Sequence, residues 1–310
     1  MIQAHVVDNA QRCIEAGSKS FAVASRLFKT DTRESAMMLY AWCRYCDDLI
    51  DGQHLGHGQR GGSRQDGFGR LEFLEDQTRL AIAGTPANHP VFMGLAEVIE
   101  RHEIPGHYPM EHLAGYRMDV ENVRYNDLAM TLAYCWRVAG VVGVMMGMVM
   151  GRRDAATLDR ASDLGMAFQL TNIARDVIED AANNRVYLPT EWLQAEGIHS
   201  AEHVLDGRSR AALGRVATRL VDAAEPYYCS AGRGISALPL RSAWSVATAR
   251  GVYRNIGQNV KAHGACAWDQ RIQSSPAAKL WFVASGAAIA LAAPMFPASP
   301  RPASLWTRPL

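Results

Sequence analysis

Hydrophobic residues recur at helical spacing along most of this chain, with polar residues at the positions between them. The clearest stretch is 32–51, where Ala, Met, Leu and Trp form one apolar face and no Pro or Gly intervenes. No convincing two-residue alternation, the mark of a β-strand, is found. The pattern therefore predicts an all-α protein of roughly ten helices. Further helices are predicted within 1–28, 71–120, 128–151, 154–182, 200–231 and 238–263.

Two stretches have the composition of loops. Residues 52–69 contain seven glycines together with Gln, His and Arg, which predicts a mobile loop. Residues 298–310 are Pro-rich and predict a flexible tail. Because no repeat of fixed period and no linker divides the remainder, we expect residues 1–310 to form one all-helical domain.

Two apolar runs raise the question of a membrane. The runs 138–151 and 280–293 each contain 14 residues. A helix of that length is about 21 Å long, whereas the hydrocarbon core is about 30 Å thick, so we expect neither run to span a membrane. A buried helix and surface contact with lipid both stay open for these runs.

Charge and cysteine content narrow the function classes. The 32 basic and 31 acidic side chains give a net charge of +1, which provides no electrostatic reason for nucleic acid as a partner. The six cysteines are scattered, and the first residues contain no basic region followed by an apolar run. We therefore expect a cytoplasmic protein and not a secreted disulfide scaffold. Nothing in the sequence indicates an oligomeric state.

The strongest chemical signal is a pair of acidic motifs. Asn172, Asp176 and Asp180 are four residues apart, so they share one helix face. Asp47 and Asp51 have the same spacing on another predicted helix. Carboxylates at this spacing repel one another, which indicates an offsetting cation. Because Mg²⁺ is typically held by one or two carboxylates together with substrate phosphates, the motifs predict a metal and a phosphate or diphosphate ester.

The alternative is that both motifs are solvated helix faces, which a single DxxxD would favour. Both motifs, however, adjoin apolar helix sequence, 40–43 in one case and 166–170 in the other, where a solvated face would have Lys and Glu. Each motif also has an arginine nearby, Arg44 or Arg175, and Arg185 is a third candidate for binding phosphate oxygens. A paired site for metal and phosphate is therefore the preferred interpretation.

Other candidate motifs indicate less chemistry. Cys43 and Cys46 form a CxxC in mid-helix without a second pair at zinc spacing. His54 and His57 lie in the glycine-rich loop without Cys or Asp partners. Neither GxGxxG after a strand nor GxxxxGK[ST] occurs, so the sequence supports neither a Rossmann fold nor a P-loop.

A glycine stripe follows one apolar helix, where Gly143, Gly147 and Gly151 recur every four residues. Each glycine costs about 0.8 to 1 kcal/mol relative to Ala in a helix interior, so the stripe needs a reason. It either permits close helix packing or leaves a channel for a long hydrocarbon chain. In the second case the adaptable apolar walls are Met145, Met146, Met148 and Met150.

Taken together, the motifs resemble those of the head-to-head prenyl synthases, and within them the bacterial phytoene synthases. The resemblance covers about residues 15 to 260, in the expected order. Its strongest part is 169–176, continuing through Asp180 to 185–189. The other matching segments are 18–21, 40–44 with 47–51, 116–119 and 134 with 138–140.

The resemblance implies an isoprenoid synthase fold, a helical bundle around a central cavity that holds two geranylgeranyl diphosphates. These would condense head to head, through a cyclopropyl diphosphate, to phytoene. Asp47, Asp51, Asp176 and Asp180 are implied as catalytic ligands of Mg²⁺, with Mn²⁺ as a substitute, and we expect no NADPH. Further implied residues are Asp48 and Asn172 in support, Arg44, Arg175 and Arg185 on phosphate oxygens, Ser18, Ser20 and Phe21 at the mouth, and Tyr134 and Tyr253 facing the reacting carbons.

Two other functions stay open at this stage. A synthase of the same fold could make squalene or dehydrosqualene from farnesyl diphosphate, because cavity depth depends on packing. A non-catalytic relative could act in assembly, although such a protein need not retain both acidic motifs. Independently of the reaction, residues 280–293 leave open a peripheral contact with the inner face of a membrane.

Overall fold

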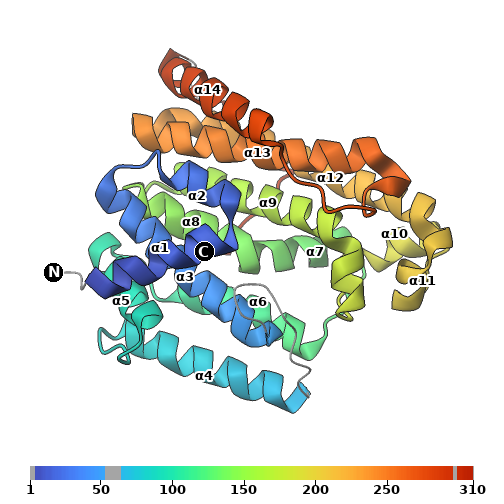
Figure 1. Ribbon diagram of the computed structural model, residues 1–310, viewed down its shortest axis with the longest axis horizontal. Coiled ribbons are helices and arrows are strands. Elements are labelled where there is room, and N and C mark those ends of the chain that lie inside the picture. Colours follow the sequence, from blue (N-terminus) through green and yellow to red (C-terminus); the bar gives the residue numbers. More distant parts are fainter. Residues whose placement is uncertain (1–3, 53–63, 296–298, 310) are drawn as a thin grey trace.

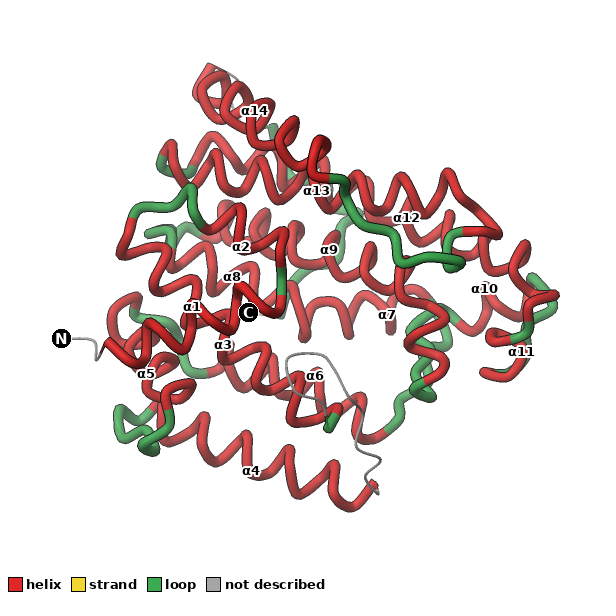
Figure 2. Tube along the Cα trace, viewed as in Figure 1, coloured by secondary structure: helices red, strands yellow, loops and turns green. Residues whose placement is uncertain are grey.

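In the computed structural model, residues 4–52, 64–295 and 299–309 are described, and within these ranges the chain forms helices and no β-strand (Figures 1 and 2). The all-α prediction is confirmed. The α-helices are α1 (Ala4–Gly17), α2 (Lys19–Ser25), α3 (Thr30–Asp51), α4 (Arg64–Ile82), α5 (Pro90–His102), α6 (His107–Glu121), α7 (Leu128–Cys135), α8 (Val141–Val149), α9 (Ala155–Ala182), α10 (Thr190–Ala195), α11 (Ala201–Leu205), α12 (Arg210–Gly234), α13 (Leu240–His263) and α14 (Pro276–Ala292). Short turns are the π-helix η1 (Trp136–Gly140) and the 3-10 helices η2 (Gly207–Ser209), η3 (Ile235–Ala237), η4 (Gly264–Cys266) and η5 (Ala293–Met295).

Local signals fix the ends of the two helices that contain the acidic motifs. α3 stops at Gly52, whose φ of 64° lets its N–H bond to carbonyls of the last turn. α9 begins after Asp154, whose side chain accepts a hydrogen bond from the Thr157 N–H. It ends at Ala182, and Asn184 then adopts a φ of 58°, so the chain turns back. Both acidic motifs therefore lie near the carboxyl ends of their helices.

The long helix α9 lies in the middle of the bundle and packs against α8, α12 and α13 (Figure 1). One apolar cluster fills the space among α1, α3, α5 and α8, and a second lies among α7, α9, α12 and α13. In the view of Figure 1, α14 rests on α13 at one edge and α4 forms the opposite edge. The acidic face of α9 is thereby brought opposite that of α3, between the two clusters.

The glycine stripe on α8 serves close packing against α9. A Cβ on Gly143 would lie 2.2 Å from the Ala161 carbonyl oxygen, and one on Gly165 of α9 would lie 2.1 Å from the Ala139 oxygen. Gly151 instead follows the helix and has a φ of 84°. Of the two interpretations left open by the sequence, packing holds and the hydrocarbon channel does not, because backbone fills the space beside Gly143.

Two helical segments are long and apolar enough, by length and composition, to cross a membrane. They are Leu128–Val149, with 22 residues, and Pro276–Met295, with 20. The expectation that both runs are too short was wrong, because each helix extends beyond the apolar run. The most apolar window of the first segment is 56% buried inside the protein, as in a core helix, whereas that of the second is only 11% buried.

The structure also revises the glycine-rich loop. α4 begins at Arg64, so residues 64–69 of the predicted loop are helical. The remainder of that prediction, 53–63 with His54 and His57, lies outside the described residues.

The carboxyl-terminal segment is not a flexible tail over its described residues, 299–309. The Arg301 guanidinium bonds both oxygens of the buried Asp163, at 2.9 and 2.7 Å. Trp306 packs on Trp136 of η1 with 5.6 Å between ring centroids. Within the predicted tail 298–310, a carboxylate far away in the sequence thus contacts the described segment and places it against the bundle.

Candidate active site

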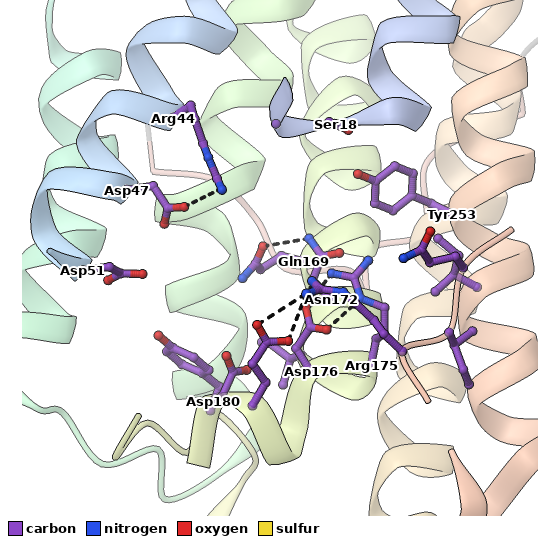
Figure 3. Close-up of a pocket in the computed structure, with 18 of the residues that line it drawn as sticks. Ser18, Arg44, Asp47, Asp51, Gln169, Asn172, Arg175, Asp176, Asp180 and Tyr253 are labelled. Atoms are coloured by element: carbon purple, nitrogen blue, oxygen red, sulfur yellow. Dashed lines mark hydrogen bonds and ion pairs between the residues drawn. The ribbon is translucent and has the colours of Figure 1, made fainter. Parts of the chain in front are cut away.

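A cavity of about 680 Å³ lies among the end of α1, α3, α6, α7, α9, α13 and the segments that follow α9 and α13. Figure 3 shows Asp47 and Asp51 on the α3 wall and Asp176 and Asp180 on the α9 wall, across the same space. The two acidic motifs, about 125 residues apart in the sequence, thus meet in the folded chain. A volume of this size is within the range of about 300 to 1,000 Å³ that is usual for small-molecule sites.

On the α3 wall, Arg44 neutralises two acids at once. Its Nη1 bonds Asp47 Oδ2 at 2.9 Å, and its Nε lies 3.3 Å from Asp48 Oδ1. Asp47 and Asp51 line the cavity, whereas Asp48 is not among the residues that line it. Burial and the charge of Asp51 raise the pKa of Asp47 to about 7, although the Arg44 guanidinium opposes the shift.

On the α9 wall, Asp176 lies between two guanidinium groups. Arg175 bonds both of its oxygens, with Nε to Oδ1 at 2.8 Å, and Arg271 Nη2 lies 3.4 Å from Oδ2. Asp180 lies one turn further along the helix. Burial and the charge of Asp176 raise the pKa of Asp180 well above its usual range.

Arg185 joins the two walls. The turn at Asn184 brings the chain back, so that the Arg185 N–H bonds the Asp180 carbonyl oxygen at 2.9 Å. Its Nη2 then pairs with Asp51 Oδ1 at 2.5 Å. This contact crosses from the end of α9 to the end of α3, which no local sequence pattern could indicate.

The donor set fits a divalent metal only when a ligand supplies further oxygens. Among the described residues, no three His, Cys, Asp or Glu side chains are grouped closely enough to hold a metal ion. The Asn172 Oδ1 atom lines this region, is buried and, within the same residues, accepts no hydrogen bond, so it is an oxygen ready for a ligand. Carboxylates on two walls with substrate phosphates between them match the way proteins hold Mg²⁺.

Aromatic side chains form the other walls. Tyr134 and Tyr253 both line the cavity, and Tyr253 stacks on Phe168 with 4.2 Å between centroids. Ser18 lines it too, while its Oγ caps α2 by accepting the Phe21 N–H at 3.2 Å. Phe21 itself packs on Tyr40, at 5.3 Å, and is not among the lining residues. The side chain of Ser20 lies outside the described part.

Sequence reasoning assigned no role to several residues of the cavity wall. Asp119 was visible as part of 116–119, but without a close partner in the sequence it received no function. Arg271 pairs with Asp176 and, at 3.0 Å, with Glu179. It lies in an irregular segment, where helical spacing gives no signal. The remaining overlooked lining residues include Tyr187, Gln273 and Lys279.

Comparison with known proteins gives a consistent result. The family model for squalene/phytoene synthase matches residues 14–278. The chain is 50% identical to the 15-cis-phytoene synthase of Pantoea ananas, covering 98% of each chain. It is 48% identical to the phytoene synthase of Pseudescherichia vulneris over all of both chains. Among solved structures, a dehydrosqualene synthase superposes with a TM-score of 0.81 at 26% identity, covering 92% of this chain and 96% of the other.

The bundle is therefore the isoprenoid synthase fold that the motifs led us to expect. Helices from both halves of the chain surround one cavity, and the matched region includes every acidic residue and every arginine described on its two walls. On this evidence the chain belongs to the squalene/phytoene synthase family.

Proposed function

We propose that this chain joins two geranylgeranyl diphosphates head to head, releases diphosphate and yields phytoene. The supporting observation is that two acidic helix faces, each with an arginine, oppose each other across one cavity in a chain 48 to 50% identical to phytoene synthases over nearly its full length. The farnesyl alternative has weaker support, because the dehydrosqualene synthase is 26% identical.

We further propose that Asp47, Asp51, Asp176 and Asp180 hold Mg²⁺, or Mn²⁺ in its place, together with the substrate diphosphates, and that no NADPH takes part. The bound metal would supply positive charge to the leaving diphosphate. Within the chain itself, three of these acids are paired with Arg44, Arg185 or Arg175. On binding, the acids would exchange their arginine partners for metal, and the guanidinium groups would bind phosphate oxygens instead.

These contacts support the following course of the reaction. One diphosphate departs with its electron pair, and Arg44, Arg175 and Arg185 stabilise its charge. The allylic cation left behind is attacked by the double bond of the second substrate, and loss of a proton closes a cyclopropane ring that still bears a diphosphate. A second ionisation, rearrangement and proton loss give phytoene, and the released diphosphate accepts the proton. Tyr134 and Tyr253, which line the cavity, would face the reacting carbons and help to keep water from the cations.

The test is incubation of the purified chain with geranylgeranyl or farnesyl diphosphate, with and without NADPH, followed by chromatography of the hydrocarbon. We expect phytoene from the C20 substrate with Mg²⁺ and no requirement for NADPH. A product formed only from farnesyl diphosphate would refute the assignment.

The acidic walls can be tested separately. Asp47→Asn or Asp176→Asn should lower kcat at least about a hundredfold, since each removes a charge aimed at the transferring group. Asp222→Asn, on the outer surface of α12, is the matched control. Calorimetry gives a second readout, because Mg²⁺ should bind detectably only with inorganic diphosphate present. Tight Mg²⁺ binding without diphosphate would contradict the shared site.

For the location, we propose a cytoplasmic enzyme that touches the inner face of the membrane through α14. The support is a surface of exposed apolar side chains on a helix that contains one lysine and no acid. This α14 surface begins beside Lys279, which lines the cavity. A hydrocarbon product that leaves the cavity there would therefore be released next to lipid. The members of the α14 surface are Leu280, Trp281, Ile289 and Leu291 of α14 together with Met295 of η5, and these residues are 72, 68, 40, 67 and 73% exposed.

Flotation with anionic liposomes tests this contact on the full chain. The variant Leu280→Ser/Trp281→Ser/Leu291→Ser should lose most of the bound fraction, while Leu205→Ser, an exposed apolar residue of α11, should keep it. Equal binding by the triple variant and the wild type would rule the α14 surface out as the anchor.

A further inference from the structure

Asp119, to which the reaction above gives no role, lies at the centre of a hydrogen-bonded aromatic cluster. Its Oδ1 accepts the Tyr187 hydroxyl at 2.9 Å, and its Oδ2 accepts the Tyr134 hydroxyl at 3.2 Å. The two tyrosine rings stack, with centroids 4.5 Å apart and planes 18° apart. Asp119, Tyr134 and Tyr187 all line the cavity. One carboxylate therefore holds two phenols in fixed orientation at the cavity wall.

The surrounding chain fixes this cluster in place. Tyr134 is the last residue but one of α7, two positions before the π-helix η1, a feature that recurs at functional sites. Tyr187 is held from its backbone, because the buried Thr131 hydroxyl donates to its carbonyl oxygen at 2.9 Å. A third ring, Tyr125, packs against both others, with its centroid 5.5 Å from that of Tyr134. The positions of the hydroxyls are thus set by three separate elements.

The direction of the two hydrogen bonds has a chemical consequence. A carboxylate can only accept, so the phenol is the donor in both hydrogen bonds to Asp119. The oxygen lone pairs are then the polar groups that each tyrosine can offer to the cavity. A phenol that donates to a charged acceptor also gains electron density on its oxygen. Both hydroxyls are consequently oriented to stabilise positive charge and not to protonate a substrate.

Ionisation of Asp119 is consistent with this role. Burial raises the pKa of Asp119 to about 6, while the Arg185 guanidinium and the two hydroxyls act in the opposite direction. The group is charged at pH 8, where the experiments below are made.

We infer that Asp119 is a positioning residue that turns the oxygens of Tyr134 and Tyr187 toward the carbocations formed in the cavity. The inference rests on the proposed function, since it requires a cationic intermediate. Asp119 itself acts through the tyrosines and through electrostatics, and contacts neither diphosphate in this account.

The kinetic test uses the isosteric variant Asp119→Asn. Its amide can accept one hydroxyl but donates to the other, so at least one hydrogen bond reverses. We expect kcat to fall about tenfold to a hundredfold, with KM for geranylgeranyl diphosphate changed less than about threefold. Tyr125→Phe, whose ring belongs to the same cluster, is the control and should keep the wild-type kcat. A loss confined to KM would overturn the inference, because Asp119 would then act on Arg185 and diphosphate binding.

A double-mutant cycle separates positioning from an independent effect. If Asp119 acts through Tyr134, then Asp119→Asn/Tyr134→Phe should be no slower than the slower single variant, within about twofold. Losses that multiply would show that the two residues act separately, which contradicts the inference.

A spectroscopic test does not depend on turnover or on a variant that folds. With ring ¹³Cζ label in the tyrosines of the wild-type chain, two of the ten tyrosine signals should lie downfield, as for phenols that donate to a carboxylate. Tyr134→Phe and Tyr187→Phe should each remove one of them. The absence of both signals in the ligand-free protein would refute the geometry. A wild type that shows both signals but makes no phytoene would instead refute the proposed function.

Discussion

His112 is a buried histidine whose protonation is disfavoured by its surroundings. Its side chain is 2% exposed and lies in α6 between the rings of Trp42 and Tyr116, at 5.1 and 5.0 Å. Its Nδ1–H donates to the Arg137 carbonyl oxygen at 3.2 Å, while Nε2 accepts no hydrogen bond from any described residue. Burial lowers the pKa of His112 from 6.5 to about 4, against the effect of the Arg137 carbonyl.

The shift makes the stability depend on pH in a defined direction. Because the folded pKa is below the unfolded one, the unfolded chain binds more protons, and the contribution of His112 is complete above pH 6.5 and is lost toward pH 4. We expect the free energy of unfolding to fall by about 1 kcal/mol from this residue between pH 7.5 and 5.5. Urea titrations at both values would measure it. His112→Gln should reduce the difference by that amount, and an unchanged difference would exclude His112 as its source.

At this same scale, the sequence predicts contacts that lie within one helix and misses those that cross between helices. Asp176 and Asp180, like Asp47 and Asp51, are visible because their spacing alone puts them on one face. Asp119 makes its hydrogen bonds with residues 15 and 68 positions away. No spacing rule connects such residues, so the tertiary fold was needed to find the cluster.

At the scale of elements, α8 and α9 approach each other closely because glycines at their contact have no side chain. The Gly143 Cα faces the backbone of Ala161, and Gly165 faces Ala139. Helix periodicity predicted both helices, but it predicted one unbroken helix over 128–151, where the structure has α7, the π-helix η1 and α8. A π-helical turn has no composition signal of its own, since it is stabilised by the packing around it.

This packing predicts opposite effects of the same substitution at two helical glycines. Gly143→Ala should lower the free energy of unfolding by about 1 to 3 kcal/mol, because the Cβ meets backbone that cannot move aside. Gly69→Ala in α4, where a Cβ meets nothing within 4 Å, should raise it by about 0.5 to 1 kcal/mol. Urea denaturation of both variants gives the comparison. An unchanged free energy of unfolding in Gly143→Ala would mean that α8 and α9 can move apart without cost.

Across the whole molecule, the carboxyl-terminal segment acts as a strap over the junction of the two apolar clusters. Trp306 packs against both clusters, and its backbone N–H donates a hydrogen bond to the Tyr227 hydroxyl oxygen at 3.1 Å. Arg301 anchors the strap to Asp163, which is fully buried on α9. Composition predicted a flexible tail because Pro-rich segments lack regular local structure. Composition contains no information about a buried partner 138 positions away.

Breaking this anchor should be costly for the entire fold. Arg301→Ala removes the bidentate partner of a buried carboxylate, so we expect a loss of about 3 to 5 kcal/mol in the free energy of unfolding. Arg208→Ala, which breaks an ion pair whose arginine is 92% exposed, should cost less than about 1 kcal/mol. Thermal and urea unfolding would compare them. Equal small losses would show that the strap is not a structural support.

The guanidinium groups on the two cavity walls have one more consequence. If carboxylates alone lined the cavity, their mutual repulsion would oppose closure of the bundle. Folding would then require a bound metal. Here the chain brings its own counter-ions, since Arg44, Arg175 and Arg185 already occupy the acids. The protein can complete its fold before it meets either substrate. Under the proposed function, metal would replace arginine beside Asp47, Asp51 and Asp176, and diphosphate would replace carboxylate beside each arginine.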